Sequence, residues 1–326
     1  MGALVLGFIK QGLRLSSTLL FGSTGEIITE KSGNLNLGTP GIMSIGGISG
    51  IIGAFFYTKS SLTFNPFVAI AITLVCAIIG SLLASLIYCL LTITLRVNQN
   101  VIGLALTTFG TGFSNFVGSV INKAMGGSGV SAFPEIGKAY SKSLPFADKL
   151  GFFGEAFLSL GFMSYFAIVL SLAVAYFISR TRTGLNLRAV GENPATADAA
   201  GINVNRYKYV ATCVGGVISG LGGLHYVMDC AGGNWSNNIL GQFGWLSVAL
   251  VIFAVWKPNV GILGSIIFGG LYILGTYLSV SVLNKELLKM LPYIVTIIVL
   301  VIISMRNKKE NQPPAHLGLS YFREDR

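Results

Sequence analysis

The chain has 326 residues, of which 10% are charged, whereas about 25% is usual for soluble proteins. Hydrophobic residues make up 52% of the chain, and the mean hydropathy is +0.72. So few charges cannot cover a soluble fold without leaving large apolar patches, so a soluble protein is excluded. The 42 glycines fit closely packed transmembrane helices, because small residues let helix backbones approach one another. The composition therefore predicts an all-α, polytopic membrane protein.

The net charge of +10 lies mainly in loops and in the C-terminal tail, as is typical of the cytoplasmic side of membrane proteins. These loops form no basic face, so we expect no nucleic-acid partner. The cysteines show no metal-ligand spacing, and we interpret them as reduced packing residues with no metal site. They are Cys76, Cys89, Cys213 and Cys230.

A helix that spans a bilayer needs about 20 mostly apolar residues. Two early segments, residues 4–28 and 35–57, are irregular, because the first carries charges and the second is rich in glycine and contains Pro40. The second segment predicts a broken or closely packed helix. We expect about eight to ten transmembrane helices, and whether both early segments cross the membrane stays open. The regular candidates are residues 67–95, 101–122, 157–179, 209–228, 243–256, 261–280 and 291–305.

Lysine and arginine set the expected orientation. The loop at residues 180–208 has five basic residues, and a tail at 307–326 follows Arg306, so both are predicted to be cytoplasmic. Four membrane spans are expected between the loop and the tail, and an even number of spans returns the chain to the same side. The two cytoplasmic assignments therefore agree with each other. We expect one transmembrane domain over residues 1–306 and a polar, disordered cytoplasmic tail over residues 307–326.

The cytoplasmic loop contains a short helix with clear signals at both ends. Asn193 can cap it, Pro194 suits its first position, and Gly201 suits the left-handed residue that ends it. Side chains this small have little apolar surface of their own to bury. We therefore predict that this short helix is a peg, meaning a rigid docking element that inserts into another protein. A linker helix lying on the membrane is the alternative, but it would need a bulky apolar face. Between the caps lie Ala195, Thr196, Ala197, Asp198, Ala199 and Ala200.

Polar groups at membrane depth are costly and suggest function. His225 and Asp229 are one helical turn apart near the outer end of their span, where they form either a structural pair or a solute contact. Glu26 is either an interfacial acid near Lys31 or a functional group.

The span at residues 101–122 carries Thr107, Thr108 and Asn115 among several glycines. Such residues serve mostly as packing contacts between helices, and lining a path is the alternative. The chain contains no GxxxxGK[ST] phosphate-binding motif and no hydrolase motif. We therefore expect a non-enzymatic chain that holds no cofactor.

The sequence GENPATADAAGINV, residues 191–204, resembles the coupling-helix segment of permease subunits of binding-protein-dependent ABC importers. The similarity is to the superfamily that transports branched-chain amino acids, ribose, simple sugars and nucleosides. Residues 25–47 resemble its early glycine-rich signature, and residues 242–275 resemble its late apolar-glycine segment. Together the similar segments run from about residue 13 to residue 303. One departure is Pro40, because many nucleoside-type members carry a glutamate there, and the role of that acid cannot be carried over.

The resemblance implies a coupling segment that docks onto a cytoplasmic ATPase, which would hold ATP and Mg. It also implies a second permease subunit, identical or homologous, an extracytoplasmic solute-binding protein, and insertion in the bilayer of a bacterial plasma membrane. Nucleosides or simple sugars are favoured as the solute over branched-chain amino acids. A secondary transporter is the rival class, but the central spans lack charges that could couple an ion. The coupling residues would be Glu192, Asn193, Pro194, Ala195, Thr196, Ala197, Asp198, Ala199 and Gly201, and Asn34, Asn36, Gly38 and Gly41 would lie beside the path.

Overall fold

The computed structural model describes residues 2–60, 63–126, 132–144, 151–278, 287–306 and 312–322. Over these ranges the chain is helical and forms no strand, and a single antiparallel bridge joins Ala132 to Asn234. The predicted all-α class is therefore confirmed.

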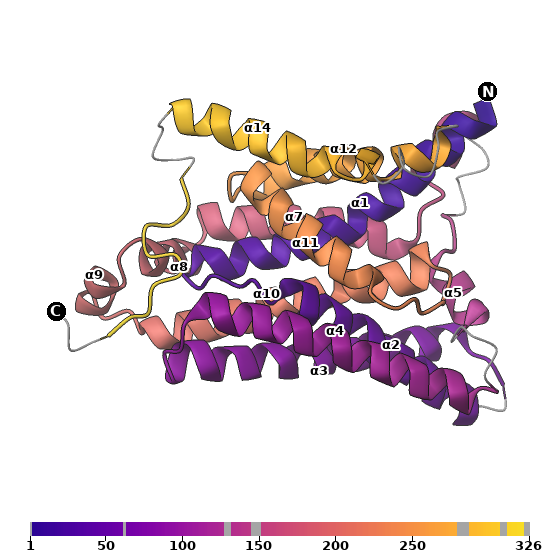
Figure 1. The fold of residues 1–326 in the computed structure, drawn as a ribbon, viewed down its shortest axis with the longest axis horizontal. Coiled ribbons are helices and arrows are strands. Elements are labelled where there is room, and N and C mark those ends of the chain that lie inside the picture. Colours follow the sequence, from indigo (N-terminus) through magenta and orange to yellow (C-terminus); the bar gives the residue numbers. More distant parts are fainter. Residues whose placement is uncertain are drawn as a thin grey trace.

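Long helices make up the body of the protein (Figure 1). Seven of those described are long and apolar enough to cross a membrane, and α11 and the apolar part of α14 are two shorter ones, in keeping with the expected eight to ten. The long helices are α1 (Gly2–Lys31), α2 (Thr39–Ser60), α3 (Pro66–Cys89), α4 (Gln99–Ala124), α7 (Phe162–Arg180), α10 (Val204–His225), α11 (Ile239–Phe253), α12 (Pro258–Tyr277) and α14 (Leu291–Arg306). Short helices are α5 (Pro134–Tyr140), α6 (Gly151–Phe157), α8 (Arg182–Glu192) and α9 (Pro194–Ala199), and π-helical turns η1 (Leu90–Thr94) and η3 (Tyr226–Cys230) extend α3 and α10.

The two ends of the bundle are distinct. Figure 1 shows α8, α9 and the C-terminal segment together at one end, and α5 and the N-terminus at the other. Because the basic loop marks the cytoplasmic end, the chain starts on the external side. The sequence left this point open.

The helix α10 lies between α1 and α2, and glycines allow the three backbones to touch. A Cβ added to Gly25 of α1 would lie 2.9 Å from the Ser219 nitrogen of α10, and one added to Gly46 of α2 would lie 2.5 Å from the Gly220 Cα. Ordinary contact begins at 3.4 Å, so no larger residue fits at either crossing without moving a helix. These three helices form the centre of the fold.

The helix α2 is closely packed but not broken. It runs without interruption from Thr39, and Pro40 occupies its first turn, where a missing N–H costs nothing. The non-helical backbone lies before it, at residues 32–38, and is largely buried. Protein groups satisfy this backbone, since the Leu35 nitrogen donates to Gln99 Oε1 at 2.7 Å. The expected break is thus corrected to a link that precedes an intact helix.

Part of the C-terminal tail is ordered against the cytoplasmic end. The His316 nitrogen donates to the Gly191 carbonyl at 3.0 Å, and the Gly318 nitrogen donates to the Gly33 carbonyl at 3.3 Å. Residues 312–322 therefore depart from the disorder expected of the whole tail, because their backbone N–H groups have acceptors in α8 and in the link before α2. The rest of that tail, residues 307–311 and 323–326, lies outside the described residues.

Candidate functional site

The short cytoplasmic helix α9 has the ends that its sequence predicts. Asn193 is extended, with φ −151° and ψ 92°, and its side-chain oxygen accepts from the Thr196 nitrogen at 3.0 Å. Pro194 is the first helical residue, and Gly201, with φ +81°, adopts the left-handed conformation just after the helix. Both ends of α9 are therefore capped by residues next to it in the sequence.

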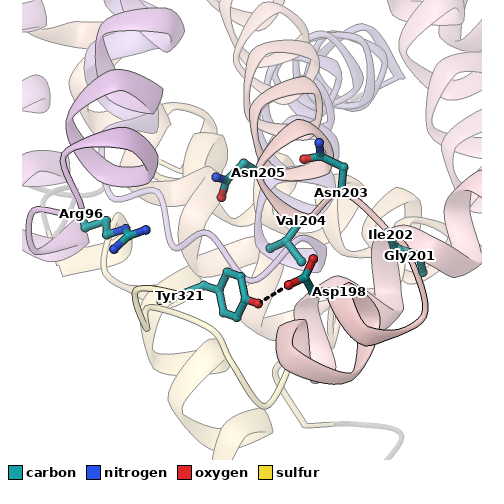
Figure 2. Close-up of a pocket in the computed structure, with 8 residues that line it drawn as sticks. All are labelled: Arg96, Asp198, Gly201, Ile202, Asn203, Val204, Asn205 and Tyr321. Carbon is teal, nitrogen blue, oxygen red and sulfur yellow. Dashed lines mark hydrogen bonds between the residues drawn. The ribbon is translucent and has the colours of Figure 1, made fainter. Parts of the chain in front are cut away.

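One face of α9 packs on the protein and the other is open. Ala197 is 3% exposed and contacts Val190 of α8 and Val204 of α10, and Pro194 is also buried. Asp198 is half-buried and accepts a hydrogen bond from the Tyr321 hydroxyl at 2.9 Å (Figure 2). The exposed members of the predicted coupling set are Glu192, Asn193, Ala195, Thr196, Ala199 and Gly201. The free face is therefore made mostly of small side chains.

A polar stripe runs along the outer half of α4. Thr108, Thr111, Asn115 and Ser119 recur every three or four residues, which places them on one side of the helix, and each is exposed or half-buried. A different side carries the exposed Phe109, Phe113 and Phe116, which suit lipid. The three hydroxyls of the stripe donate to carbonyl groups one turn earlier in α4, whereas the Asn115 amide pairs with a neighbouring element.

The polar surface continues onto α11 and α12. Asn115 donates to Asn238 Oδ1 at 2.7 Å, and the Asn238 nitrogen donates back to Asn115 Oδ1 at 3.2 Å. One helical turn along α11, Gln242 accepts from the Tyr272 hydroxyl at 3.1 Å, and Trp245 is 36% exposed. The surface thus combines neutral hydrogen-bonding groups with aromatic rings. Sequence reasoning identified Asn115 but missed Asn238, which is distant along the chain.

Several residues predicted to lie beside the path hold the link before α2 in place. Asn34 donates to Thr212 at 3.0 Å, and Thr107 donates to the Leu37 carbonyl at 2.7 Å. A Cβ on Gly41 would lie 2.8 Å from the Thr107 Cα, so α2 and α4 are in backbone contact there. The residues of this group are Asn34, Asn36, Gly38, Gly41 and Thr107, and all are buried.

His225 and Asp229 lie in a closed polar cluster between α1, α7 and the end of α10. The two nitrogens of His225 lie 2.8 Å from Thr18 Oγ1 and 3.1 Å from Ser164 Oγ. Asp229 lies 3.4 Å from the ring of His225 and 3.6 Å from Arg14 Nε, and the His225 and Asp229 side chains are fully buried. Sequence reasoning found the pair but not Arg14, which belongs to a helix far away in the chain. The cluster is separate from the polar stripe.

Two carboxyl groups of α1 are buried nearer the cytoplasmic end. Glu26 accepts from the Thr39 hydroxyl, and Glu30 accepts from Trp256 Nε1. Neither is more than 4% exposed, so Glu26 is not an interfacial acid beside Lys31. The pair ties α1 to the start of α2 and to the turn after α11.

A bundle of membrane-crossing helices, with a polar stripe inside the bilayer and a bare peg at its cytoplasmic end, defines the membrane subunit of a transporter. The sequence family described as "Branched-chain amino acid transport system / permease component" matches residues 8–300, and the chain belongs to this family. It is the non-catalytic permease component of an ABC transporter, a multi-pass protein of the bacterial plasma membrane that works with an ATPase and a solute-binding protein.

Relatives with assigned names cover almost the whole chain. The nucleoside ABC transporter permease protein NupC of Lactococcus lactis subsp. cremoris is 32% identical, over 87% of this chain and 88% of its own. The guanosine ABC transporter permease protein NupQ of Bacillus subtilis is 30% identical over the same shares. A provisionally named glucose ABC transporter permease protein of Haloferax volcanii, TsgC13, is 30% identical over 98% of both chains.

Proposed function

We propose that this subunit forms one side of a translocation path for nucleosides or simple sugars. The polar stripe on α4 and its continuation on α11 carry this proposal, because they gather uncharged hydroxyl and amide groups on one side of the bundle, and amide groups such as the paired Asn115 and Asn238 are costly against lipid. Residues 108–119 and 238–245 contain no acidic or basic residue. Uncharged groups with aromatic rings beside them suit a neutral solute that forms hydrogen bonds and stacks, whereas a zwitterionic amino acid would need charged partners.

The named relatives support this choice of solute, since two are named for nucleosides or guanosine and one for glucose. The stripe is open in the single chain, and a second permease subunit, identical or homologous, covers it in the complex. The solute-binding protein delivers the solute at the external end, near α5. ATP and Mg bind to the ATPase and not to this chain.

The exposed face of α9 docks into the cytoplasmic ATPase. The small side chains at Ala195 and Ala199 permit close backbone contact, and the caps at Asn193 and Gly201 keep the peg rigid. ATP binding moves the two ATPases together, and the pegs transmit this motion to the helices as rigid elements.

The docking is tested with Ala199→Trp, which adds bulk at an exposed position. We expect the variant to lose co-purification with the co-expressed ATPase while its thermal stability stays unchanged. Ala124→Trp, at the exposed external end of α4, is the matched control and keeps the association. Unchanged co-purification of the Ala199→Trp variant would remove α9 from the interface.

The path is tested with Asn115→Leu in an uptake assay. Loss of one hydrogen bond between this amide and the solute, worth about 1 kcal/mol, should lower uptake roughly fivefold. Phe116→Leu, on the lipid-facing side of α4, should transport normally. Competition of labelled uptake by nucleoside, ribose and leucine identifies the solute, and competition by leucine alone would contradict the proposal.

A further inference from the structure

The C-terminal segment 315–321 is bound on one side to the coupling helices. The His316 nitrogen donates to the carbonyl of Gly191 in α8, and the Tyr321 hydroxyl donates to Asp198 of α9 at 2.9 Å. In Figure 2 the phenol of Tyr321 lies between Asp198 and Arg96, beside a hollow of ≈ 460 Å³. The acceptor is a carboxylate, which makes this hydrogen bond stronger than one between neutral groups, so Tyr321 is tied directly to α9.

The ring of Tyr321 adds an apolar contact. It packs against the small cluster of Val190, Ala197 and Val204, which joins α8, α9 and α10. The buried face of α9 is therefore held by its neighbours in sequence and by a residue from the far end of the chain.

On its other side the segment is bound to the membrane helices. Gly318 donates its N–H to the Gly33 carbonyl at 3.3 Å, in the link before α2. The side-chain amide of Gln99 donates to the Leu319 carbonyl at 3.4 Å. Gln99 is the first residue of α4, so the segment is bound directly to the helix that carries the polar stripe.

We propose that residues 315–321 act as a transmission strap, through which movement of α9 reaches α4 and the path. This inference rests on the proposed docking of α9 and adds a second connection to it. The direct route from α9 to the bundle runs through α8 and α10, and neither of these carries the stripe. Tyr321 is a positioning residue, since it acts on the path only through Asp198 and the strap.

The test uses Tyr321→Phe in the complete transporter, reconstituted in vesicles with its ATPase and solute-binding protein. The change removes one hydroxyl and keeps the ring in its apolar contact. We expect normal co-purification with the ATPase, retained ATP hydrolysis, and a several-fold fall in solute imported per ATP hydrolysed. Tyr176→Phe, on an exposed face of α7, is the matched control and leaves the ratio unchanged.

A deletion variant separates the possible outcomes. Deletion of residues 315–326 removes the whole strap and should uncouple at least as strongly as Tyr321→Phe. A wild-type ratio in both Tyr321→Phe and the deletion variant would overturn the strap. Loss of ATPase binding in Tyr321→Phe would also overturn it, because Tyr321 would then be a docking residue. Failure of the docking of α9 is recognised separately, by ATPase binding in Ala199→Trp.

Discussion

Two glycines on α4, two residues apart, should respond in opposite ways to the same substitution. A Cβ at Gly110 would lie 2.6 Å from the carbonyl oxygen and 2.7 Å from the Cα of Gly41 in α2. These are backbone atoms that cannot rotate away, so Gly110→Ala must push the helices apart by about 0.8 Å. Overpacking costs about 1–3 kcal/mol, and the better helix propensity of alanine returns about 1 kcal/mol, which leaves a net loss of up to about 2 kcal/mol.

At Gly112 an added Cβ meets nothing within 4 Å. Gly112→Ala should therefore be neutral or stabilise by up to about 1 kcal/mol. Thermal unfolding in detergent, followed by tryptophan fluorescence, measures both variants, and each kcal/mol corresponds to roughly 2–4 °C in a protein of comparable size. Gly110→Ala should therefore be less stable than Gly112→Ala by about 1–3 kcal/mol. Equal stability of the two variants would refute the backbone contact between α2 and α4.

The remaining predictions concern pH and oxidation. Burial, and then the charge of Lys208, lower the pKa of His316 in the docked tail below its ordinary value. Below about pH 6.5, the ordinary pKa of histidine, His316 binds a proton more readily in the released tail than in the docked tail. Acid therefore favours the released tail and weakens docking. After correction for the intrinsic rate, amide hydrogen exchange over residues 312–322 should be faster at pH 5.5 than at pH 7.5. His316→Gln should remove this difference. Slower exchange at pH 5.5 would contradict the expected pH dependence of tail docking. A separate prediction concerns Cys89 and Cys213, whose sulfur atoms lie 3.9 Å apart. Mild oxidation with copper phenanthroline should form a disulfide between them and so join α3 to α10. Peptide mapping detects this disulfide, and Cys89→Ser should abolish it. Reaction of another cysteine in preference would argue against this helix pairing.

Features set by neighbouring residues were predictable from the sequence. Asn193, Pro194 and Gly201 delimit α9 as expected, because a helix cap depends on local backbone groups. The all-α class followed from composition alone. Which side of a six-residue helix faces inward could not be predicted, and Ala197, expected in the docking set, packs inward against Val204.

Features that depend on distant contacts were not predictable. The polar composition of the tail predicts disorder. In the structure, however, the backbone amide of His316 donates a hydrogen bond to the carbonyl of Gly191, 125 residues earlier in the sequence. In the same way a single helix shows Asn115 as a polar residue but cannot show that Asn238 pairs with it. The residue pattern along one helix predicts which side chains are polar. Their hydrogen-bond partners depend on how several helices pack together.

The contact of α1, α2 and α10 through Gly25, Gly46 and Gly220 bears on how the subunit changes shape. Backbones that meet with no side chain between them have no room to slide, and tightly packed interfaces switch between discrete arrangements in preference to deforming gradually. We therefore expect these three helices to keep their mutual geometry when the subunit changes shape. Any tilting would then involve the helices that surround them.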